Sequence, residues 1–479
     1  MQDYKKQFKG KRITIMGLGV LGRGLGYTKF LAECGADLIV TDLKPSTALR
    51  SSLKKLQNFK NVKYVLGKHR LEDFRGRDMI IKAAGVPLDS IYIKEARKNG
   101  IPVEMDVSLF AKCAPEVMLI GVTGTRGKSM VTTLVYEILK KNEKLLKKKV
   151  YIGGNIRGVA TLPLLKKTKE SDILVCELDS WQLQGFGDAK ISPDIAVFTS
   201  FMPDHMNYYG STSFDKAQDK SLTTSKKAMK RYFKDKVNIF KYQKENDVLI
   251  IRGGMKKFIK KGDTKGKIII VSTKDVERYN FIVPGEHQKE NLACAVEVAK
   301  QFNIPDAKIA QSIKNFKGLE GRLQYVKEIK GIKIYNDNNA TTPEATIAGI
   351  EALSIYKTEK TQSSPVLNKH RATLCKNIIL ICGGADKKLP LDSFVKVINK
   401  YCKAVIMIPG TGTDKLINNY ELRITNEKVK DLNEAVVAAL GKASRGDIIL
   451  FSPAFASFEQ FNNEYERNDL FLKIIKKLK

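Results

Sequence analysis

Short apolar runs alternate with longer amphipathic stretches along most of the chain. The apolar runs have the length of strands, and the stretches between them have the pattern of helices. Strands that alternate with helices in this way are typical of parallel sheets in α/β proteins. The strands predicted in the first half of the chain are 12–16, 36–41, 79–82, 101–104, 118–122, 150–152, 172–178 and 195–198.

The order of these elements predicts three domains in a chain of 479 residues. At roughly 100 to 200 residues per domain, this length is too great for a single core. Residues 1–113 are predicted to form a Rossmann-like domain. Residues 114–317 are predicted to form a central domain with a doubly wound parallel sheet and a phosphate loop (P-loop). Residues 318–479 repeat the alternation and predict a second Rossmann-like domain, closing over the other two.

A Gly-rich turn follows the predicted strand 118–122 and ends in Gly-Lys-Ser at 127–129, where a helix begins. Backbone N–H groups of such a turn and of a helix N-terminus bind phosphate. Lys128 would reach the β- and γ-phosphates of a nucleotide, and the Ser129 hydroxyl would hold Mg²⁺. The spacing departs from the usual loop, which has a Gly at the position of Val122. The order of strand, turn and helix still argues against a chance match.

A second Gly motif, G-x-G-x-x-G at 17–22, follows the first predicted strand, and Asp42 ends the next one. Alone, this pattern predicts a dinucleotide site, with the acidic side chain on a ribose, and therefore a nicotinamide dehydrogenase. The same turn can also cradle any diphosphate. A further nucleotide site at Lys128 does not fit a simple dehydrogenase.

Other polar side chains follow predicted strands, where ligands of open parallel sheets bind. Glu177 ends the strand 172–178, and His205 lies in a Pro-Asp turn after the strand 195–198. Glu177 and phosphate oxygens would suit Mg²⁺, whereas a His ligand is less usual for this ion. We therefore expect Lys128, Glu177 and His205 to project to one edge of the central sheet.

Composition excludes several classes of protein. Hydrophobic residues make up 43% and charged residues 28% of the chain, as in globular proteins. We expect a cytoplasmic protein, because there is no apolar run of membrane-spanning length and no apolar signal core near the N-terminus. The seven cysteines are scattered and predict reduced thiols. The net charge of +33 comes from Lys spread over helices and loops, which favours a Lys-rich surface attracting anionic substrates over a nucleic-acid interface.

Several motifs together resemble the ATP-dependent Mur ligases, and within them the branch that adds D-glutamate. The resemblance covers almost the whole chain. It is carried by TGTRGKS at 123–129, GGNI at 153–156, ELDSWQL at 177–183, DHM at 204–206, GEH at 285–287 with Asn291, RLQ at 322–324, Asn336-Asp337 with Ala340-Thr341, SPA at 452–454 and Ser457-Phe458.

The resemblance implies an enzyme that adds D-glutamate to UDP-N-acetylmuramoyl-L-alanine during cytoplasmic peptidoglycan precursor synthesis. ATP would phosphorylate the substrate carboxylate, and the amine of D-glutamate would attack the acyl phosphate. The partners implied are these small molecules, with no nucleic acid and no membrane, and we expect a monomer. A related Mur or folylpolyglutamate-type ligase adding another amino acid is the nearest alternative.

By the same resemblance the catalytic residues are Lys128, Glu177, His205 and Lys236, and two Mg²⁺ ions are expected. Ser129 and Glu177 would hold one ion and His205 the second, with a carbamylated lysine as a bridging ligand. Lys236 fits the family pattern Y-x-x-D-K-x-x-I, while Lys220 lies nearer His205 in sequence; we choose Lys236.

The binding residues implied by the resemblance fall into three sets. ATP is assigned to Gly124, Thr125, Arg126, Gly127, Lys128, Ser129, Asn291, Arg322 and Asp337. The UDP-substrate is assigned to Gly17, Gly19, Val20, Leu21, Gly22, Asp42, Gly85 and Asn155. D-Glutamate is assigned to Thr341, Lys387, Ser457 and Phe458.

Departures from the family pattern are also visible. Asn339 stands where many relatives have Lys, and Glu464 stands where an aromatic residue is expected, which Phe461 or Tyr465 could supply. The polar segments 211–227 and 358–376 look like inserted loops, and we expect both to be exposed, disordered and without a catalytic part.

Two alternatives from other classes make different predictions. A P-loop nucleic-acid ATPase would show ATP hydrolysis stimulated by DNA or RNA. A nicotinamide enzyme would bind its cofactor at 17–22 and would not turn over ATP.

Overall fold

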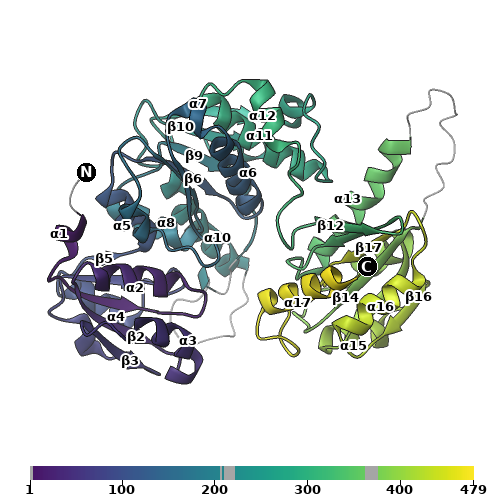
Figure 1. Ribbon diagram of the computed structural model, residues 1–479, viewed down its shortest axis with the longest axis horizontal. Coiled ribbons are helices and arrows are strands. Elements are labelled where there is room, and N and C mark those ends of the chain that lie inside the picture. Colours follow the sequence, from purple (N-terminus) through teal and green to yellow (C-terminus); the bar gives the residue numbers. More distant parts are fainter. Residues whose placement is uncertain (1–3, 205–207, 210–221, 362–375, 479) are drawn as a thin grey trace. The chain divides into compact units, whose positions relative to one another are not determined.

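The computed structural model describes residues 4–204, 208–209, 222–361 and 376–478 (Figure 1). These residues form three sheets, each combined with helices, so the predicted α/β fold is confirmed. The chain forms two compact units, one of residues 1–279 with 290–313 and the other of 280–289 with 314–479. The first unit holds two of the sheets. The domain limits predicted at 113 and 317 stay predictions.

The first sheet has five parallel strands in the order β3-β2-β1-β4-β5. They are β1 (Arg12–Met16), β2 (Asp37–Asp42), β3 (Val62–Leu66), β4 (Met79–Lys82) and β5 (Val103–Glu104). The strand order reverses at β1, so the turn after β1 lies at a switch point of the sheet. Its helices are α1 (Tyr4–Phe8), α2 (Arg23–Glu33), α3 (Ser46–Leu56), α4 (Ile91–Lys98) and α5 (Asp106–Cys113).

The central sheet has six parallel strands in the order β11-β10-β9-β6-β8-β7. They are β6 (Met118–Thr123), β7 (Val150–Gly154), β8 (Ile173–Glu177), β9 (Ile195–Phe198), β10 (Val248–Arg252) and β11 (Lys267–Val271). Because all six are parallel, their carboxyl ends meet at one edge. Its helices are α6 (Lys128–Lys141), α7 (Glu143–Leu146), α8 (Ser180–Ala189), α10 (Leu222–Lys236), α11 (Glu286–Gln301) and α12 (Asp306–Ile313).

The first two sheets belong to one unit and share a continuous hydrophobic core. Asp106 at the start of α5 accepts hydrogen bonds from the backbone N–H groups of Thr161 (2.7 Å) and Leu162 (2.8 Å). Helix α2 approaches the same segment so closely that a Cβ on Gly26 would lie 2.5 Å from the Cβ of Ala160. These contacts fix the turn after β1 beside the turn that follows β7.

The third sheet forms the core of the second unit, in the order β12-β13-β17-β14-β15-β16. Only the pairing of β12 with β13 is antiparallel. The strands are β12 (Gln324–Ile329), β13 (Ile332–Asn336), β14 (Ile378–Gly383), β15 (Cys402–Ile408), β16 (Thr425–Lys428) and β17 (Ile448–Phe451). The Lys330-Gly331 turn has two positive φ angles, as hairpin turns require.

Helices pack on both faces of this third sheet, as predicted for a Rossmann-like domain. One face carries α13 (Pro343–Thr361), α14 (Asp392–Tyr401) and α15 (Thr411–Asn419). The other carries α16 (Leu432–Lys442) and α17 (Glu464–Lys477), where the ring of Phe471 stacks on that of Phe451.

The two segments expected to be disordered loops are partly helical, so the expected disorder is wrong for 222–227 and 358–361, while Lys226 and Lys227 are exposed as expected. Helix α10 begins at Leu222, and α13 continues to Thr361. Farther along α10, Ala228 and Tyr232 pack into a small cluster with Tyr209. This packing stabilises the helix, whereas the polar residues at its start gave no helical pattern in the sequence. Residues 211–221 and 362–375 lie outside the described residues. No helix in the described ranges is long and apolar enough to cross a membrane.

Candidate active site

The phosphate loop joins β6 to α6 and is anchored by the segment that follows β9. The backbone N–H of Thr125 donates to the Ser200 carbonyl (2.8 Å), and the N–H of Arg126 donates to the Ser200 hydroxyl (2.9 Å). The hydroxyl of Thr199 donates to the Arg126 carbonyl (2.5 Å). These bonds fix the shape of the loop, and it follows a strand and precedes a helix as predicted.

Two glycines of the loop have no room for a side chain. Gly124 has a φ of +145°, and a Cβ there would lie 2.1 Å from the Thr199 hydroxyl oxygen. Gly127 has a φ of +88°, and a Cβ there would lie 2.4 Å from the amide oxygen of Asn291. The loop keeps this conformation and these close approaches only if both positions remain glycine.

Two lysine side chains converge on the loop. Lys128 Nζ donates to the carbonyl oxygens of Gly124 (2.9 Å) and Thr125 (3.1 Å). Lys236 Nζ, from the last turn of α10, donates to the same Gly124 oxygen (2.9 Å) and lies 3.3 Å from the Thr123 hydroxyl. The Lys128 ammonium and the N-terminus of α6 together make the environment of the loop positive, which suits an anionic ligand.

Lys236 is 1% exposed. Burial, assisted by the nearby positive charge of Lys128, lowers the pKa of Lys236 to about 7. A large fraction of this side chain is therefore a neutral amine near neutral pH. Only the neutral form has the lone pair that attacks carbon dioxide, so the site meets the main chemical requirement for a carbamylated lysine.

Glu177 ends β8 and is 4% exposed. The side-chain amide of Asn155 reaches its carboxylate at 3.5 Å, which is a marginal hydrogen bond, and the Asn155 backbone N–H donates to the Glu177 carbonyl (2.7 Å). On its other side, Asn155 accepts a hydrogen bond from the guanidinium of Arg23 (2.8 Å). Arg23 opens α2 directly after the 17–22 turn, so it links the predicted UDP-substrate turn to the predicted magnesium ligand.

The residues predicted to bind magnesium are placed only in part. Ser129 lies in the first turn of α6, Glu177 ends β8 and Lys236 ends α10, while His205 lies outside the described residues, as does Lys220. Within the described ranges, no group of three or more His, Cys, Asp or Glu side chains could hold a metal. A buried carboxylate with only a marginal amide donor keeps oxygen lone pairs for a hard cation, so Glu177 fits this role.

The 17–22 turn lies at the carboxyl edge of the first sheet. Gly17 has a φ of +100°, and a Cβ there would lie 2.8 Å from the Cβ of Ala83 in the turn that contains Gly85. The Asp42 carboxylate accepts from the backbone N–H groups of Gly19 (2.9 Å) and Lys44 (2.8 Å). Asp42 therefore shapes the turn, and its ligand-binding role stays a prediction. Val20 and Leu21 of the turn are 53% and 48% exposed, which leaves apolar surface at its tip.

In the second unit, Asp337 follows β13 and is 8% exposed. Its carboxylate accepts from the Leu323 backbone N–H (3.0 Å) and the Ser452 hydroxyl (2.8 Å). Burial raises the pKa of Asp337 to about 7, against the opposing effect of these bonds and of the exposed Arg322. An acid held partly protonated can both donate to and accept from a hydroxyl group.

Replacing Asp337 by Asn is expected to remove a pH dependence of stability. The pKa of this carboxyl rises from its ordinary value of 3.8 to about 7 on folding, so the folded state binds more protons in this window. Wild-type stability should therefore fall as the pH rises from 4 to 7, by at most about 4 kcal/mol. Denaturant unfolding of both proteins across this range measures the slope. Asp414→Asn, at an exposed carboxylate of the same unit, should keep it.

The predicted D-glutamate residues lie around the ends of β13, β14 and β17. Lys387 Nζ donates to the Thr341 hydroxyl (2.9 Å). Ser457 is buried, and Ala456 before it pairs with Ala385 in an isolated antiparallel β-bridge. Phe458 is 60% exposed. Lys387, Thr341 and Ser457 are thus near one another on this unit. Asn339, at the departure position, donates its backbone N–H to the carbonyl of Gly321 (2.8 Å), which lies in the segment before β12.

Sequence reasoning missed three arginines that the structure brings to these regions. Arg23 contacts Asn155, Arg252 ends β10 beside the phosphate loop, and the fully buried Arg467 donates to the Asn338 side chain (2.8 Å). Arg23 had a local signal, since it directly follows a Gly turn that could bind a diphosphate. The other two had none.

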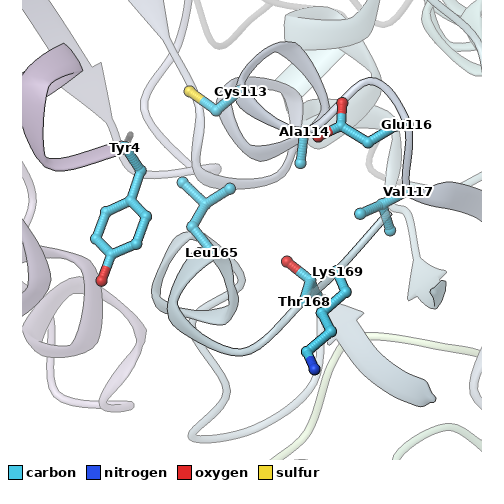
Figure 2. A pocket seen from close by; sticks show the side chains of 8 residues that line it. All are labelled: Tyr4, Cys113, Ala114, Glu116, Val117, Leu165, Thr168 and Lys169. Atoms are coloured by element: carbon cyan, nitrogen blue, oxygen red, sulfur yellow. The ribbon is translucent and has the colours of Figure 1, made fainter. Parts of the chain in front are cut away.

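A small cavity is located away from all of these residues (Figure 2). Its lining comes from Tyr4, Cys113, Ala114, Glu116, Val117, Leu165, Thr168 and Lys169. Burial raises the pKa of the Cys113 thiol to about 11, so this cysteine is not a reactive thiolate. The cavity contains no predicted site residue.

Comparison with known proteins gives full-length matches. Family models match at 11–104 (Mur ligase MurD-like, N-terminal domain), 122–299 (Mur ligase middle domain) and 321–455 (Mur ligase, glutamate ligase domain). Proteins named UDP-N-acetylmuramoylalanine--D-glutamate ligase from Roseiflexus sp. (strain RS-1) and Borreliella afzelii (strain PKo) are 32% and 34% identical. Each alignment covers 98% of this chain. It covers 99% of the Roseiflexus protein and 98% of the Borreliella protein.

A solved structure, of MurF ligase from Thermotoga maritima in complex with ADP, is similar in fold. Its TM-score is 0.52 at 16% identity, and the alignment covers 99% of this chain and 96% of that one. At this identity the likeness supports the three-domain fold alone.

Proposed function

Because the chain belongs to the Mur ligase family, we propose that it joins D-glutamate to UDP-N-acetylmuramoyl-L-alanine at the expense of ATP. The observation that carries this proposal is the full-length similarity to relatives named for that reaction. The convergence of Lys128, Lys236 and the start of α6 on one phosphate loop supports it. The reaction belongs to peptidoglycan synthesis, and we place it in the cytoplasm with the enzyme acting as a monomer.

The proposed chemistry has two steps. A carboxylate is a poor electrophile, so an oxygen of the L-alanyl carboxylate first attacks the γ-phosphorus of ATP, giving an acyl phosphate and ADP. The neutral amine of D-glutamate then attacks the acyl carbon. The C–O bond to phosphate breaks, inorganic phosphate leaves, and the amine loses a proton as the amide forms. Charge on the transferred phosphoryl group must be neutralised in the first step.

We assign that neutralisation to groups of the phosphate loop. Lys128 would leave the carbonyls of Gly124 and Thr125 for the β- and γ-phosphates of ATP. Ser129, Glu177 and a carbamate on Lys236 would supply oxygen ligands for Mg²⁺, which lowers the charge of the phosphates. His205 remains the proposed ligand of a second ion.

We assign the substrates to the regions described above. The UDP-substrate would lie along the 17–22 turn, Asp42 and Gly85 toward Asn155. Asn291 would contact the adenine, while Asp337 and Arg322 of the second unit would contact the ribose and a phosphate. Lys387 would pair with a carboxylate of D-glutamate, beside Thr341, Ser457 and Phe458.

Phosphate release from ATP and Mg²⁺ tests the proposal. We expect release only when UDP-N-acetylmuramoyl-L-alanine and D-glutamate are both present, and mass spectrometry should show the amide product. Parallel reactions contain L-glutamate, L-alanine or L-lysine in place of D-glutamate. If another amino acid supports turnover and D-glutamate does not, the proposed specificity is wrong; if release needs DNA or RNA, the proposed ligase reaction is wrong.

A further inference from the structure

Arg252 is a buried cation for which the proposed reaction has no role. It is the last residue of β10, at the carboxyl edge of the central sheet, and is 9% exposed. Strand β10 is separated from β6 by β9 alone, and the phosphate loop starts where β6 ends. A buried arginine at a ligand-binding edge calls for an explanation, because removing its charge from water is costly unless the guanidinium has partners.

The partners of Arg252 lie on the first half of α11. Nη1 donates to the Glu290 carboxylate at 3.0 Å, and Nη2 donates to the side-chain oxygen of Asn291. The same guanidinium contacts the thiol of Cys294 one turn farther along the helix. Arg252 thus connects the end of a central strand to the helix that carries Asn291.

The same groups lie directly over the start of α6. A Cβ on Gly127 would be 2.4 Å from the Asn291 amide oxygen and 2.8 Å from Arg252 Nη2. A guanidinium beside a helix N-terminus meets the positive end of the helix dipole, which opposes it unless an anion is also present. The placement is therefore consistent with a nucleotide whose phosphates lie on this loop.

The contact also fixes which way the Asn291 amide faces. Arginine has only donors, so the Asn291 atom turned toward Nη2 must be the oxygen. The amide nitrogen then points away from Arg252. The charged donor therefore stabilises this orientation of the amide over the reverse one.

We propose that Arg252 is a positioning residue that fixes the donor–acceptor order of Asn291 and so makes the site select adenine over guanine. An oriented Asn amide matches the N6 donor and N7 acceptor of adenine, whereas guanine presents two acceptors, O6 and N7, on that edge. An amide that is held less strictly in this orientation discriminates less between the two bases. The inference rests on the proposed function, in which Asn291 contacts the base of ATP.

The test is the equilibrium binding of ATP and GTP, with Mg²⁺, to the full chain by calorimetry. In Arg252→Met we expect the preference for ATP over GTP to fall by about 10-fold, because ATP binds more weakly. The free energy of a hydrogen bond to a charged group corresponds to a change in affinity of about that size. Arg252→Lys keeps one flexible donor and should give an intermediate preference. Glu290 is on the surface, with 44% of its side chain exposed, so the Met variant leaves no buried unpaired carboxylate.

Two controls separate positioning from a structural role. Glu290→Gln weakens the ion pair but keeps the Asn291 contact, so its ATP preference should equal that of the wild type. In an Asn291→Ala background, Arg252→Met should cause no further loss of preference. An unchanged preference in Arg252→Met, or an equal further loss in the double variant, would overturn the inference. Because binding needs neither co-substrate, a failed ligase assay leaves this test intact.

Discussion

Replacing Lys128 by Ala is expected to reduce kcat for co-substrate-dependent phosphate release by about 1000-fold or more. The Lys128 amine lies at the start of α6, held by the carbonyls of Gly124 and Thr125, and the methyl group of Ala cannot stabilise charge on the transferred phosphoryl group. The loop itself is anchored by Thr199 and Ser200, so its shape should survive the substitution. Steady-state phosphate release, with saturating D-glutamate and UDP-substrate, measures the loss.

A lysine at the other end of the same helix provides the matched control. Lys141 donates to the Ser312 carbonyl (2.7 Å), far from the phosphate loop in α6. Lys141→Ala should lower stability slightly and leave kcat within about 2-fold of the wild type, as for most surface substitutions. If Lys128→Ala instead kept more than about a tenth of the wild-type kcat, the loop would not carry the phosphoryl transfer assigned to it.

The elements that position the site were predictable from local sequence. β1 and β9 have the predicted bounds, because a short apolar run before a Gly-rich or Pro-containing turn is both a strand signal and a termination signal. The phosphate loop was predictable for the same reason, despite its altered spacing. At Gly127 the backbone conformation and the close approach of Asn291 both require the glycine that the motif contains.

The interactions between distant segments were not predictable. β12 and β13 form an antiparallel hairpin whose partner strand β17 lies more than a hundred residues later, so no local pattern indicates the sheet order. Arg467 is fully buried against Asn338, although its helix has the composition of a surface helix. Polar residues become structural or functional through neighbours supplied by the tertiary fold, and hydrophobic periodicity does not report those neighbours.

Replacing Lys236 by Ala is the second large loss that we expect, again about 1000-fold in kcat, because a metal ligand typically contributes several kcal/mol to charge stabilisation. The Lys236 amine is buried beside Gly124, and its pKa of about 7 keeps much of it neutral and able to take up carbon dioxide. Wild-type activity should therefore fall as the pH drops below 7, where this amine becomes protonated. NMR with ¹³C-bicarbonate should show a carbamate signal that Lys236→Ala lacks.

Chemical rescue distinguishes a carbamate from a merely structural lysine. Acetate or propionate added to Lys236→Ala could place a carboxylate in the vacated space, so we expect part of the lost activity to return; a structural lysine would give no such response. Lys234→Ala, at an exposed position of the same helix, should behave as the wild type.

Lys220 provides the decisive comparison. If Lys220→Ala lost the carbamate signal and recovered activity with acetate, while Lys236→Ala kept both signal and activity, the bridging ligand would be Lys220. The low pKa of Lys236 would then reflect its burial alone.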